Sequence, residues 1–255
     1  MCDEMSGRLE SKVLVVTGGT QGMGLAFARR AATEGARVVI GARDKDRGEE
    51  VAAQIRTAGG AALFVPTDVT VEEEMARLVD AAVTEYGRLD GAFNNAGGGP
   101  MASVRETDSD NWHRSLALNL TSVFYGLKYE LPAIIASGGG AIVNNASVSG
   151  VKGDPTQAAY NAAKHGVIGL TRSAALDVAR SNVRVNALVT GLIDTPLWQN
   201  VVSQAPEAAE RYLSTQPTGR AGTSDEVAAL TTFLLSDEAT FISGASIAID
   251  GAFTA

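Results

Sequence analysis

The amino-acid sequence predicts an α/β fold with a doubly wound sheet of seven parallel strands and helices on both faces. Short apolar runs alternate with longer segments of helical composition along the whole chain, which is the pattern of successive right-handed β-α-β units. The 255 residues are 45% hydrophobic and 20% charged, and no linker, repeat or low-complexity segment divides them. We therefore expect a single domain over residues 1–255, with the strand order 3-2-1-4-5-6-7.

In the first half of the chain, four apolar runs predict strands and the more polar segments between them predict helices. Gly35 is placed to end the first helix. Asp68 or Thr70 is expected to cap the third helix, whose first turn carries three glutamates suited to the positive end of a helix. The expected strands cover 13–16, 37–40, 62–65 and 91–93, and the expected helices cover 25–34, 44–57 and 71–86.

The second half continues the alternation. Pro132 lies near the end of the long fourth helix or kinks it. The stretch 190–222 is less regular because prolines interrupt its short helical pieces, and Ser224 is expected to cap the last helix. The expected helices cover 110–131, 156–180 and 224–235, the strands cover 141–144, 184–188 and 246–249, and the interrupting prolines are Pro196, Pro206 and Pro217.

A glycine-rich segment, TGGTQGMG at 17–24, joins the first strand to the first helix. Such a turn lets the main chain approach a pyrophosphate closely, and the helix behind it directs free N–H groups and its positive end at the phosphates. This context predicts a Rossmann-type dinucleotide site. The alternative is an ordinary glycine turn without a ligand, because glycine is common in turns.

Charge and composition exclude several classes of function. The formal net charge is −8 and no basic block occurs, which argues against nucleic acid or an anionic membrane as a partner. The single cysteine, Cys2, forms no intrachain disulfide and no metal site by itself. No signal peptide or membrane-spanning run is recognised, so we expect a cytoplasmic enzyme or binding protein.

A candidate catalytic group surrounds Tyr160 and Lys164. Residues four apart on a helix share one face, and a nearby ammonium would favour the phenolate and lower the pKa of the tyrosine. Ser147 follows the fifth strand, where its hydroxyl could bond a substrate carbonyl oxygen, and Ser149 is a competing candidate. A structural Tyr/Lys pair and a simple turn serine are the alternatives. The two histidines, His113 and His165, are assigned to the surface or the scaffold.

With these motifs in this order, the whole chain resembles the single-domain short-chain dehydrogenase/reductases. The resemblance implies an NAD(P)-dependent oxidoreductase that interconverts a secondary alcohol and a ketone, with a small-molecule substrate and a homotetrameric assembly. The motifs that carry it are Thr17 to Gly24, Asp68, Asn94-Asn95-Ala96-Gly97, Asn119, Ser147, Tyr160 with Lys164, Ser243-Gly244 and Asp250-Gly251.

The resemblance also implies a role for each matching residue. Tyr160 would be the general acid or base, Lys164 would lower its pKa and hold the nicotinamide ribose, Ser147 would position the substrate oxygen, and Asn119 would support a water-linked proton path. The remaining positions would contact the dinucleotide: Gly18, Gly19, Thr20, Gln21 and Met23 at the pyrophosphate and the adjacent ribose; Asp68 and Val69 at the adenine; Asn95, Ala96 and Gly97 at the ribose; and Ile193 with Thr195 at the nicotinamide.

Departures from the family pattern bear on the loop after the sixth strand and on cofactor choice. Thr190-Gly191 stands where the family often has Pro-Gly, so we expect a less restrained loop. Ala163 stands where a serine often precedes the lysine, which would remove a minor contact. Ala42 replaces the acid that would bind an NAD ribose, and Arg43 beside it could pair with a 2′-phosphate. We therefore favour NADP(H), with NAD(H) as the alternative and Arg43 as a merely solvated charge in that case.

The substrate is left open by the sequence. An apolar lid is expected at about 190–215, and packing of the same residues in the core or at a subunit interface is an equally weighted alternative. The substrate could be an oxoacyl thioester, a steroid, a sugar or a cyclic diol. A non-catalytic NAD(P)-binding sensor or scaffold is the rival function. The residues proposed for the lid are Leu192, Leu197, Trp198, Val201, Val202, Tyr212 and Leu213.

Overall fold

A computed structural model describes residues 7–99 and 102–255, and Cys2 lies outside these ranges. Its main sheet has the order β3-β2-β1-β4-β5-β6-β9 with every neighbouring pair parallel, which confirms the predicted fold class and strand order. The strands are β1 (Val13–Thr17), β2 (Arg37–Ala42), β3 (Ala61–Pro66), β4 (Gly91–Asn94), β5 (Gly140–Asn145), β6 (Val183–Thr190) and β9 (Ser246–Ile249).

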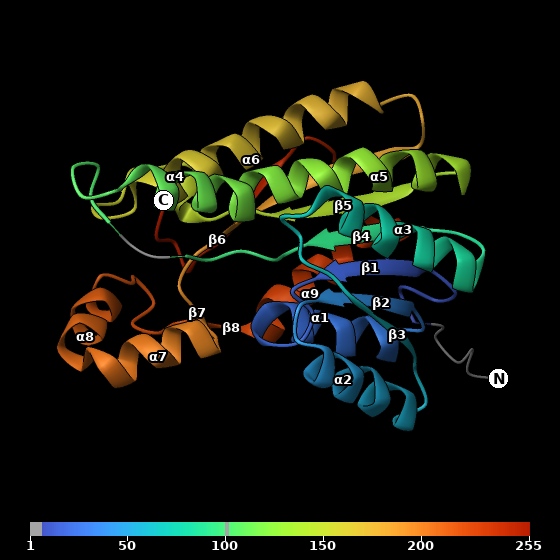
Figure 1. Cartoon of the computed structure of the whole chain (residues 1–255), viewed down its shortest axis with the longest axis horizontal. Coiled ribbons are helices and arrows are strands. Elements are labelled where there is room, and N and C mark those ends of the chain that lie inside the picture. Colours follow the sequence, from blue (N-terminus) through green and yellow to red (C-terminus); the bar gives the residue numbers. More distant parts are fainter. Residues whose placement is uncertain (1–6, 100–101) are drawn as a thin grey trace.

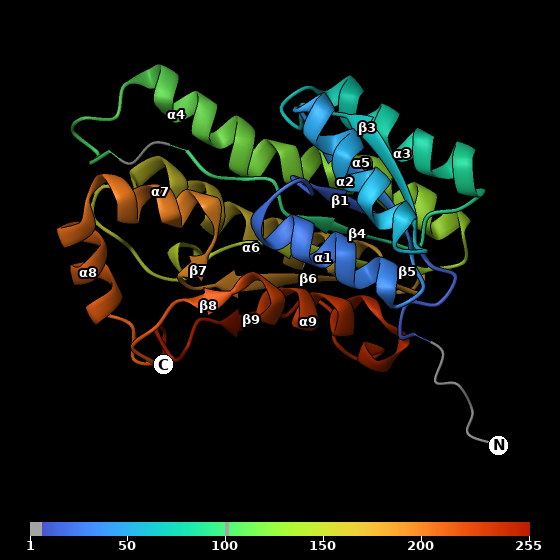
Figure 2. The same ribbon diagram turned by 90° about the horizontal axis from the view of Figure 1, so that it is seen from below.

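Helices cover both faces of this sheet, and each face has its own apolar core (Figure 1). The helices of one core pack beside α1, and those of the other pack beside α5; the two layers are seen from a second side in Figure 2. The first group is α1 (Gly22–Thr33), α2 (Lys45–Thr57) and α9 (Ser224–Leu235), and the second is α3 (Glu72–Tyr86), α4 (Ser109–Leu116), α5 (Ser122–Ala136) and α6 (Ala158–Asp177).

The central strands are buried on both sides, which explains why their sequences are continuous apolar runs. All five residues of β1 are buried, and Phe27 of α1 meets Phe93 of β4 edge to face with ring centroids 5.3 Å apart. Burial of this kind stabilises a fold by roughly 25 cal/mol for each Å² of apolar surface. The predicted strands are correct because a parallel sheet covered on both faces requires such runs.

Two helix caps differ from the expectation. Val71 is the N-cap of α3, and the Asp68 carboxylate instead accepts hydrogen bonds from the main chain and hydroxyl of Thr70. Thr223 caps α9 in a reciprocal pair with Glu226, whereas the Ser224 hydroxyl donates to the main-chain oxygen of Asp194. A local turn with Thr70 takes the Asp68 side chain, whereas a contact with β7, 30 positions away, takes the Ser224 hydroxyl.

The expected fourth helix is one helical run interrupted by the π-turn η1 (Ala117–Thr121), and Pro132 lies within α5. The helix expected over 156–180 is shorter, because Thr156 has a left-handed φ of 60° that no helix accommodates. The remaining elements are the pair β7 (Ile193–Asp194) and β8 (Gly222–Thr223), the short turns η2 (Val148–Gly150) and η3 (Asp237–Ala239), and the helices α7 (Pro196–Gln204) and α8 (Pro206–Ser214).

The irregular segment between β6 and α9 is therefore more ordered than expected. Pro196 and Pro206 begin α7 and α8 instead of interrupting them, since a proline at the first helical position loses no hydrogen bond. The two helices stand apart from the sheet, beyond the carboxyl end of β6 (Figure 1). This placement puts the segment over the edge at which a parallel sheet binds its ligands.

Candidate active site

In the glycine turn at 17–24, main-chain segments approach one another too closely to leave room for side chains. Gly18 and Gly22 have positive φ values of 65° and 51°, and a Cβ on Gly24 would lie 2.3 Å from the main-chain oxygen of Gly18. A side chain at any of these positions would strain the backbone or collide with it. The turn thus brings the start of α1 directly behind the end of β1, with main-chain groups facing outward, and these residues fit a pyrophosphate.

Tyr160 and Lys164 lie in the first two turns of α6 and share one face, as predicted. The Lys164 Nζ lies 5.5 Å from the centroid of the Tyr160 ring. Lys164 is 2% exposed, and its Nζ donates to the main-chain oxygen of Asn145 at 2.6 Å. This contact holds the ammonium at the carboxyl end of β5, beside Ser147.

The electrostatics of the pair differ from the expectation. Burial raises the pKa of the Tyr160 phenol, the Ser147 side chain in hydrogen-bonding reach offsets part of that rise, and Tyr212 adds to it. Burial also lowers the pKa of Lys164 to about 8. The sequence predicted a lowered pKa for Tyr160, but withdrawal from water disfavours the phenolate here and weakens the charge of its lysine neighbour.

The two candidate serines are separated by their partners. The Ser149 hydroxyl lies 2.9 Å from Asp154 Oδ2 and 3.2 Å from Gln157 Oε1, to either of which it can donate. Ser147 Oγ accepts from the main-chain N–H of Ser149 at 3.1 Å and keeps its proton for another acceptor. Because Ser147 also lies within reach of Tyr160, it is the serine suited to a substrate oxygen.

Asn119 lies inside the π-turn η1 and is completely buried. Its side-chain oxygen accepts from Gly98 N at 2.8 Å, and its amide donates to the main-chain oxygens of Gly98 and Ser115. A π-turn shifts the helical hydrogen-bond register and recurs at functional sites. The side chain of Asn119 therefore anchors the loop after β4, and a role in proton transfer would fall to its main chain.

The residues expected at the dinucleotide gather along the same edge. A Cβ on Gly97 would lie 2.9 Å from Asn119 Oδ1 and 3.4 Å from Lys164 Nζ, so this glycine keeps the space beside the ammonium open. Thr195 also belongs to the site, since its Cγ2 would lie 3.2 Å from a Cβ on Gly22. A nicotinamide dinucleotide fits this edge from the glycine turn to Lys164.

At the other end of the edge, β2 stops at the buried Ala42 and Arg43 is exposed. Asp44 caps α2 by accepting from the main-chain N–H of Arg47, so it is not an ion-pair partner of Arg43. Hydrogen bonds from Thr70 lower the pKa of Asp68, and the positive charge of Arg43 contributes. Arg43 is therefore within electrostatic range of Asp68, which precedes the buried Val69, but no ion pair joins the two in the described part of the chain.

The segment after β6 provides aromatic side chains. Trp198 of α7 and Tyr212 of α8 have ring centroids 6.0 Å apart, and Tyr212 lies 6.5 Å from Phe253 near the C-terminus. The Lys152 Nζ lies 3.8 Å above the Phe253 ring and 3.3 Å from Asp154 Oδ1. These contacts connect the aromatic side chains to the loop between Ser147 and Tyr160. Three other residues expected in the lid, Leu197, Val201 and Val202, lie on α7.

Known proteins share this arrangement. A family model described as "Enoyl-(Acyl carrier protein) reductase" matches residues 18–254. The chain belongs to the short-chain dehydrogenase/reductase family. It is 40% identical to cyclohexanol dehydrogenase of Acinetobacter sp. (strain SE19) over 98% of both chains, and 43% identical to cis-4-hydroxycyclohexanecarboxylate dehydrogenase of Sinomonas cyclohexanicum over 98% of this chain and all of that one.

Solved structures agree. The crystal structure of levodione reductase superposes with a TM-score of 0.91 at 34% identity, covering 96% of this chain and 99% of the other. As a short-chain dehydrogenase/reductase, the chain is an oxidoreductase that interconverts secondary alcohols and ketones with a nicotinamide cofactor. The relatives are named as enzymes, and none of this favours a non-catalytic sensor or scaffold.

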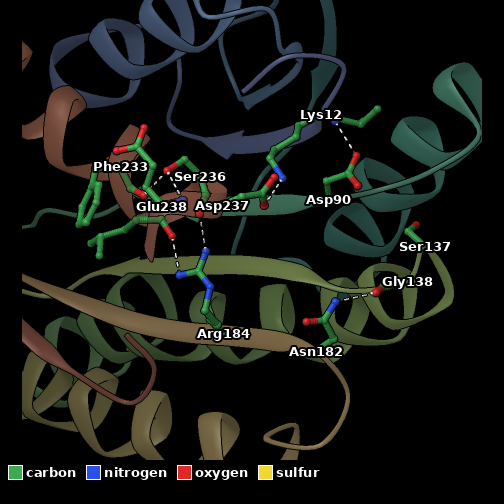
Figure 3. Close-up of polar contacts among 12 residues, drawn as sticks. Lys12, Asp90, Ser137, Gly138, Asn182, Arg184, Phe233, Ser236, Asp237 and Glu238 are labelled. Atoms are coloured by element: carbon green, nitrogen blue, oxygen red, sulfur yellow. Dashed lines mark hydrogen bonds and ion pairs between the residues drawn. The ribbon is translucent and has the colours of Figure 1, made fainter. Parts of the chain in front are cut away.

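A separate cavity of about 790 Å³ lies at the opposite, amino edge of the sheet (Figure 3). Its polar groups are paired within the protein: Lys12 bonds Asp237 at 2.8 Å, and Arg184 donates to the main-chain oxygens of Leu234 and Ser236. This cavity is lined by none of the site residues of the dehydrogenase/reductase. We assign the chemistry to the carboxyl edge.

Residues 7–99 and 102–255 contain no group of three side chains suited to a metal ion, and none of their helices is long and apolar enough to span a membrane.

The sequence interpretation missed two positions of the site, Asn145 and Phe253. Asn145 acts through its main-chain oxygen, which no residue type reveals. Phe253 lies 93 positions from Tyr160 and reaches the site only through the fold.

Hydrogen bonds also join the loop after β6 to neighbouring strands. Thr190 is buried, and its hydroxyl donates to Asn145 Oδ1 at 3.2 Å, while Gly191 N donates to the main-chain oxygen of Ile249 at 3.0 Å. A side-chain hydrogen bond therefore links this position to β5, where the family often has a proline ring, and the expectation of a less restrained loop stays a prediction.

Proposed function

We propose that this protein is an NADP(H)-dependent dehydrogenase of alicyclic secondary alcohols, with Tyr160 as the general acid/base. The convergence of Ser147, Tyr160 and Lys164 beside the glycine turn is the observation that carries this proposal. A bound nicotinamide cofactor supplies the hydride acceptor for oxidation or the hydride donor for reduction.

Residues of the chain orient the substrate, transfer the proton and bind the cofactor. The Ser147 hydroxyl bonds the substrate oxygen and fixes its direction toward Tyr160. In oxidation the Tyr160 phenolate accepts the proton of the alcohol O–H as the hydride leaves the carbinol carbon, and in reduction the phenol returns that proton to the carbonyl oxygen. Lys164 binds the nicotinamide ribose with the two donors that Asn145 leaves available, and Asn119 holds the loop that borders it.

NADP(H) is favoured by the end of β2. Ala42 offers no carboxylate to bind a ribose diol or to repel a phosphate, and Arg43 makes no ion pair with any residue in the described part of the chain. A guanidinium paired with a phosphate contributes about 1.5–3 kcal/mol, or roughly 10- to 100-fold in affinity. Asp68 opposes the preference for NADP(H), because the negative charge of its carboxylate acts on Arg43 and competes with a 2′-phosphate.

A double substitution tests the cofactor. We expect kcat/KM to favour NADP(H) in the wild type and to move toward NAD(H) by about 10-fold or more in Ala42→Asp/Arg43→Leu. Arg47→Leu is the matched control, since Arg47 is an exposed arginine of α2 that pairs with Glu50. A wild-type preference for NAD(H) would leave Arg43 as a surface charge and refute the NADP(H) proposal.

An alicyclic substrate is favoured by the aromatic contacts of the segment at about 190–215, which we propose as the substrate lid. The Trp198 and Tyr212 rings contact each other, Tyr212 also contacts Phe253, and Tyr212 is near enough to Tyr160 to raise its pKa. Aromatic ring faces contact an apolar ring better than a charged chain. Several relatives are named for cyclic alcohols, among them cyclopentanol dehydrogenase of Comamonas testosteroni at 39% identity.

The test is cofactor reduction, measured by absorbance. Cyclopentanol and cyclohexanol are each compared with a straight-chain secondary alcohol of the same carbon number. We expect higher kcat/KM for the rings. Equal values for ring and chain would refute the substrate class while leaving the reaction type intact.

Assembly and location are further proposals. We propose a homotetramer, supported by membership of the family, by the edge position of β9 and by the exposed side chains of Phe124 and Ile135 on α5. Light scattering would contradict it by reporting a monomer. A cytoplasmic location stays a prediction from the sequence, to be tested by cell fractionation.

A further inference from the structure

A row of polar side chains crosses the carboxyl ends of four adjacent strands. Thr17 ends β1, Asn95 follows β4, Asn145 ends β5 and Thr190 ends β6. Thr17, Asn145 and Thr190 are each at most 5% exposed. The row runs from the glycine turn to the loop after β6.

The hydrogen bonds of this row have one possible direction. The Asn95 amide nitrogen donates to the main-chain oxygen of Thr17 at 3.1 Å, and a carbonyl can only accept, so Asn95 Oδ1 faces Asn145. The Asn145 amide nitrogen donates to that oxygen at 3.2 Å, which turns Asn145 Oδ1 toward Thr190. The Thr190 hydroxyl donates to it at 3.2 Å, and the main-chain oxygen of Ala146, 3.5 Å from the same hydroxyl, is the more distant competing acceptor. Position 190 therefore requires a hydrogen-bond donor.

Asn145 connects this row to the catalytic lysine. Its main-chain oxygen accepts from Lys164 Nζ at 2.6 Å, while its side chain bonds Asn95 on one side and Thr190 on the other. A buried amide oxygen without a donor is costly, so the side chain would turn or shift to find one. A turn of the side chain alone would leave the main-chain oxygen in place, whereas a shift of the Asn145 backbone would displace the acceptor that orients the Lys164 ammonium.

We propose that Thr190 is a positioning residue of the dinucleotide site, acting through Asn145 on Lys164. Thr190 touches neither the substrate nor the reacting atoms; its hydroxyl fixes the Asn145 amide, and thereby the oxygen that holds the ammonium. The inference rests on the proposed function, because dinucleotide binding is the property that Thr190 would control.

Thr190→Val removes the donor and keeps the shape of the side chain. We expect the dissociation constant of NADPH, titrated by protein fluorescence with NADH in parallel, to rise about 10-fold, with a smaller fall in kcat. Thr190→Ser keeps the donor and should stay within about twofold of the wild type. Thr232→Val is the matched control, since the buried Thr232 hydroxyl has no hydrogen-bond partner in the described chain.

A double-mutant cycle separates positioning from general damage. Asn145→Ala removes the amide that Thr190 serves, so Thr190→Val should cost little more on that background. An equal loss of NADPH affinity on both backgrounds would overturn the proposal, as would equal affinities for Thr190→Val and Thr190→Ser. If Thr190→Val does not fold, Asn145→Ala alone carries the test, because it breaks the same bond and should weaken NADPH binding.

The wild-type titration distinguishes this inference from the proposed function. A wild-type protein that binds neither NADPH nor NADH would refute both. A wild-type protein that binds a dinucleotide, together with a Thr190→Val variant of unchanged affinity, would refute only the role of Thr190.

Discussion

Glu130 of α5 is a completely buried carboxyl group that takes no part in the proposed reaction. Its Oε2 accepts from the Asn94 amide at 2.9 Å, and its Oε1 has no partner in the described chain. Asn94 also donates to Asn144, which donates to Thr171, so the polar groups on this side of Glu130 are neutral. Burial raises the pKa of Glu130 to about 7, and the hydrogen bond from Asn94 only partly offsets that rise.

The consequence for stability has a definite sign. Between pH 4.5 and about 7 the unfolded chain releases the Glu130 proton while the folded chain retains it, so the free energy of unfolding falls as the pH rises through this window. Above the folded pKa both states are ionised and the loss is complete. At about 1.4 kcal/mol for each pKa unit, the loss amounts to about 3 kcal/mol.

Glu130→Gln removes the titration and keeps the shape of the side chain. We expect urea unfolding at constant protein concentration to show the variant gaining about 2.5 kcal/mol relative to the wild type between pH 5 and pH 8, since part of the loss has already occurred by pH 5. Glu49→Gln, at an exposed position of α2, is the matched control and should show no such change. A difference between the wild type and Glu130→Gln that is the same at both pH values would refute the reasoning.

Two further predictions concern the active site. Tyr160→Phe should lower kcat by about 10²- to 10⁴-fold with the NADPH dissociation constant nearly unchanged, because the phenol acts on the proton in transit; near-normal turnover by the folded variant would exclude Tyr160 as the acid/base. Phe253→Ala should raise KM for cyclohexanol about 10-fold, because it removes an aromatic contact surface. Lys152→Met should raise that KM about 3-fold, because it removes the cation above the Phe253 ring. In both variants kcat should stay within twofold of the wild type. Lys128→Met is the control, since Lys128 also contacts a carboxylate and an aromatic ring, but on α5 beside α3.

The sequence was sufficient for the fold because the fold depends on signals that are local along the chain. Continuous apolar runs identify strands buried on both faces, and glycines mark the turns between them. The caps were harder, since the Asp68 side chain bonds Thr70 two positions away and the Ser224 hydroxyl bonds Asp194, which is distant in sequence. Residue type alone does not decide which of two short hydrogen bonds a side chain will make.

The composition of the site was also accessible to sequence reasoning, but its electrostatics were not. Tyr160 and Lys164 are four residues apart, so a helix brings them together whatever surrounds it. The pKa of Tyr160 depends instead on burial and on the charge of residues as distant in sequence as Tyr212. The same limit applies to Thr190, whose partner Asn145 is 45 positions away and belongs to a neighbouring strand.

The amino and carboxyl edges of the sheet differ in how their cationic side chains are paired, and this difference distinguishes a ligand site from a cavity without a ligand. At the amino edge, the Asp237 carboxylate neutralises Lys12 and two main-chain oxygens accept from Arg184, so a ligand there would have to displace existing partners. At the carboxyl edge, Lys164 donates to one protein oxygen, and Arg43 makes no ion pair within residues 7–99 and 102–255. A dinucleotide would complete the hydrogen bonding of these cations at little cost to the protein. Unused donors on a rigid edge therefore indicate the site more reliably than volume does.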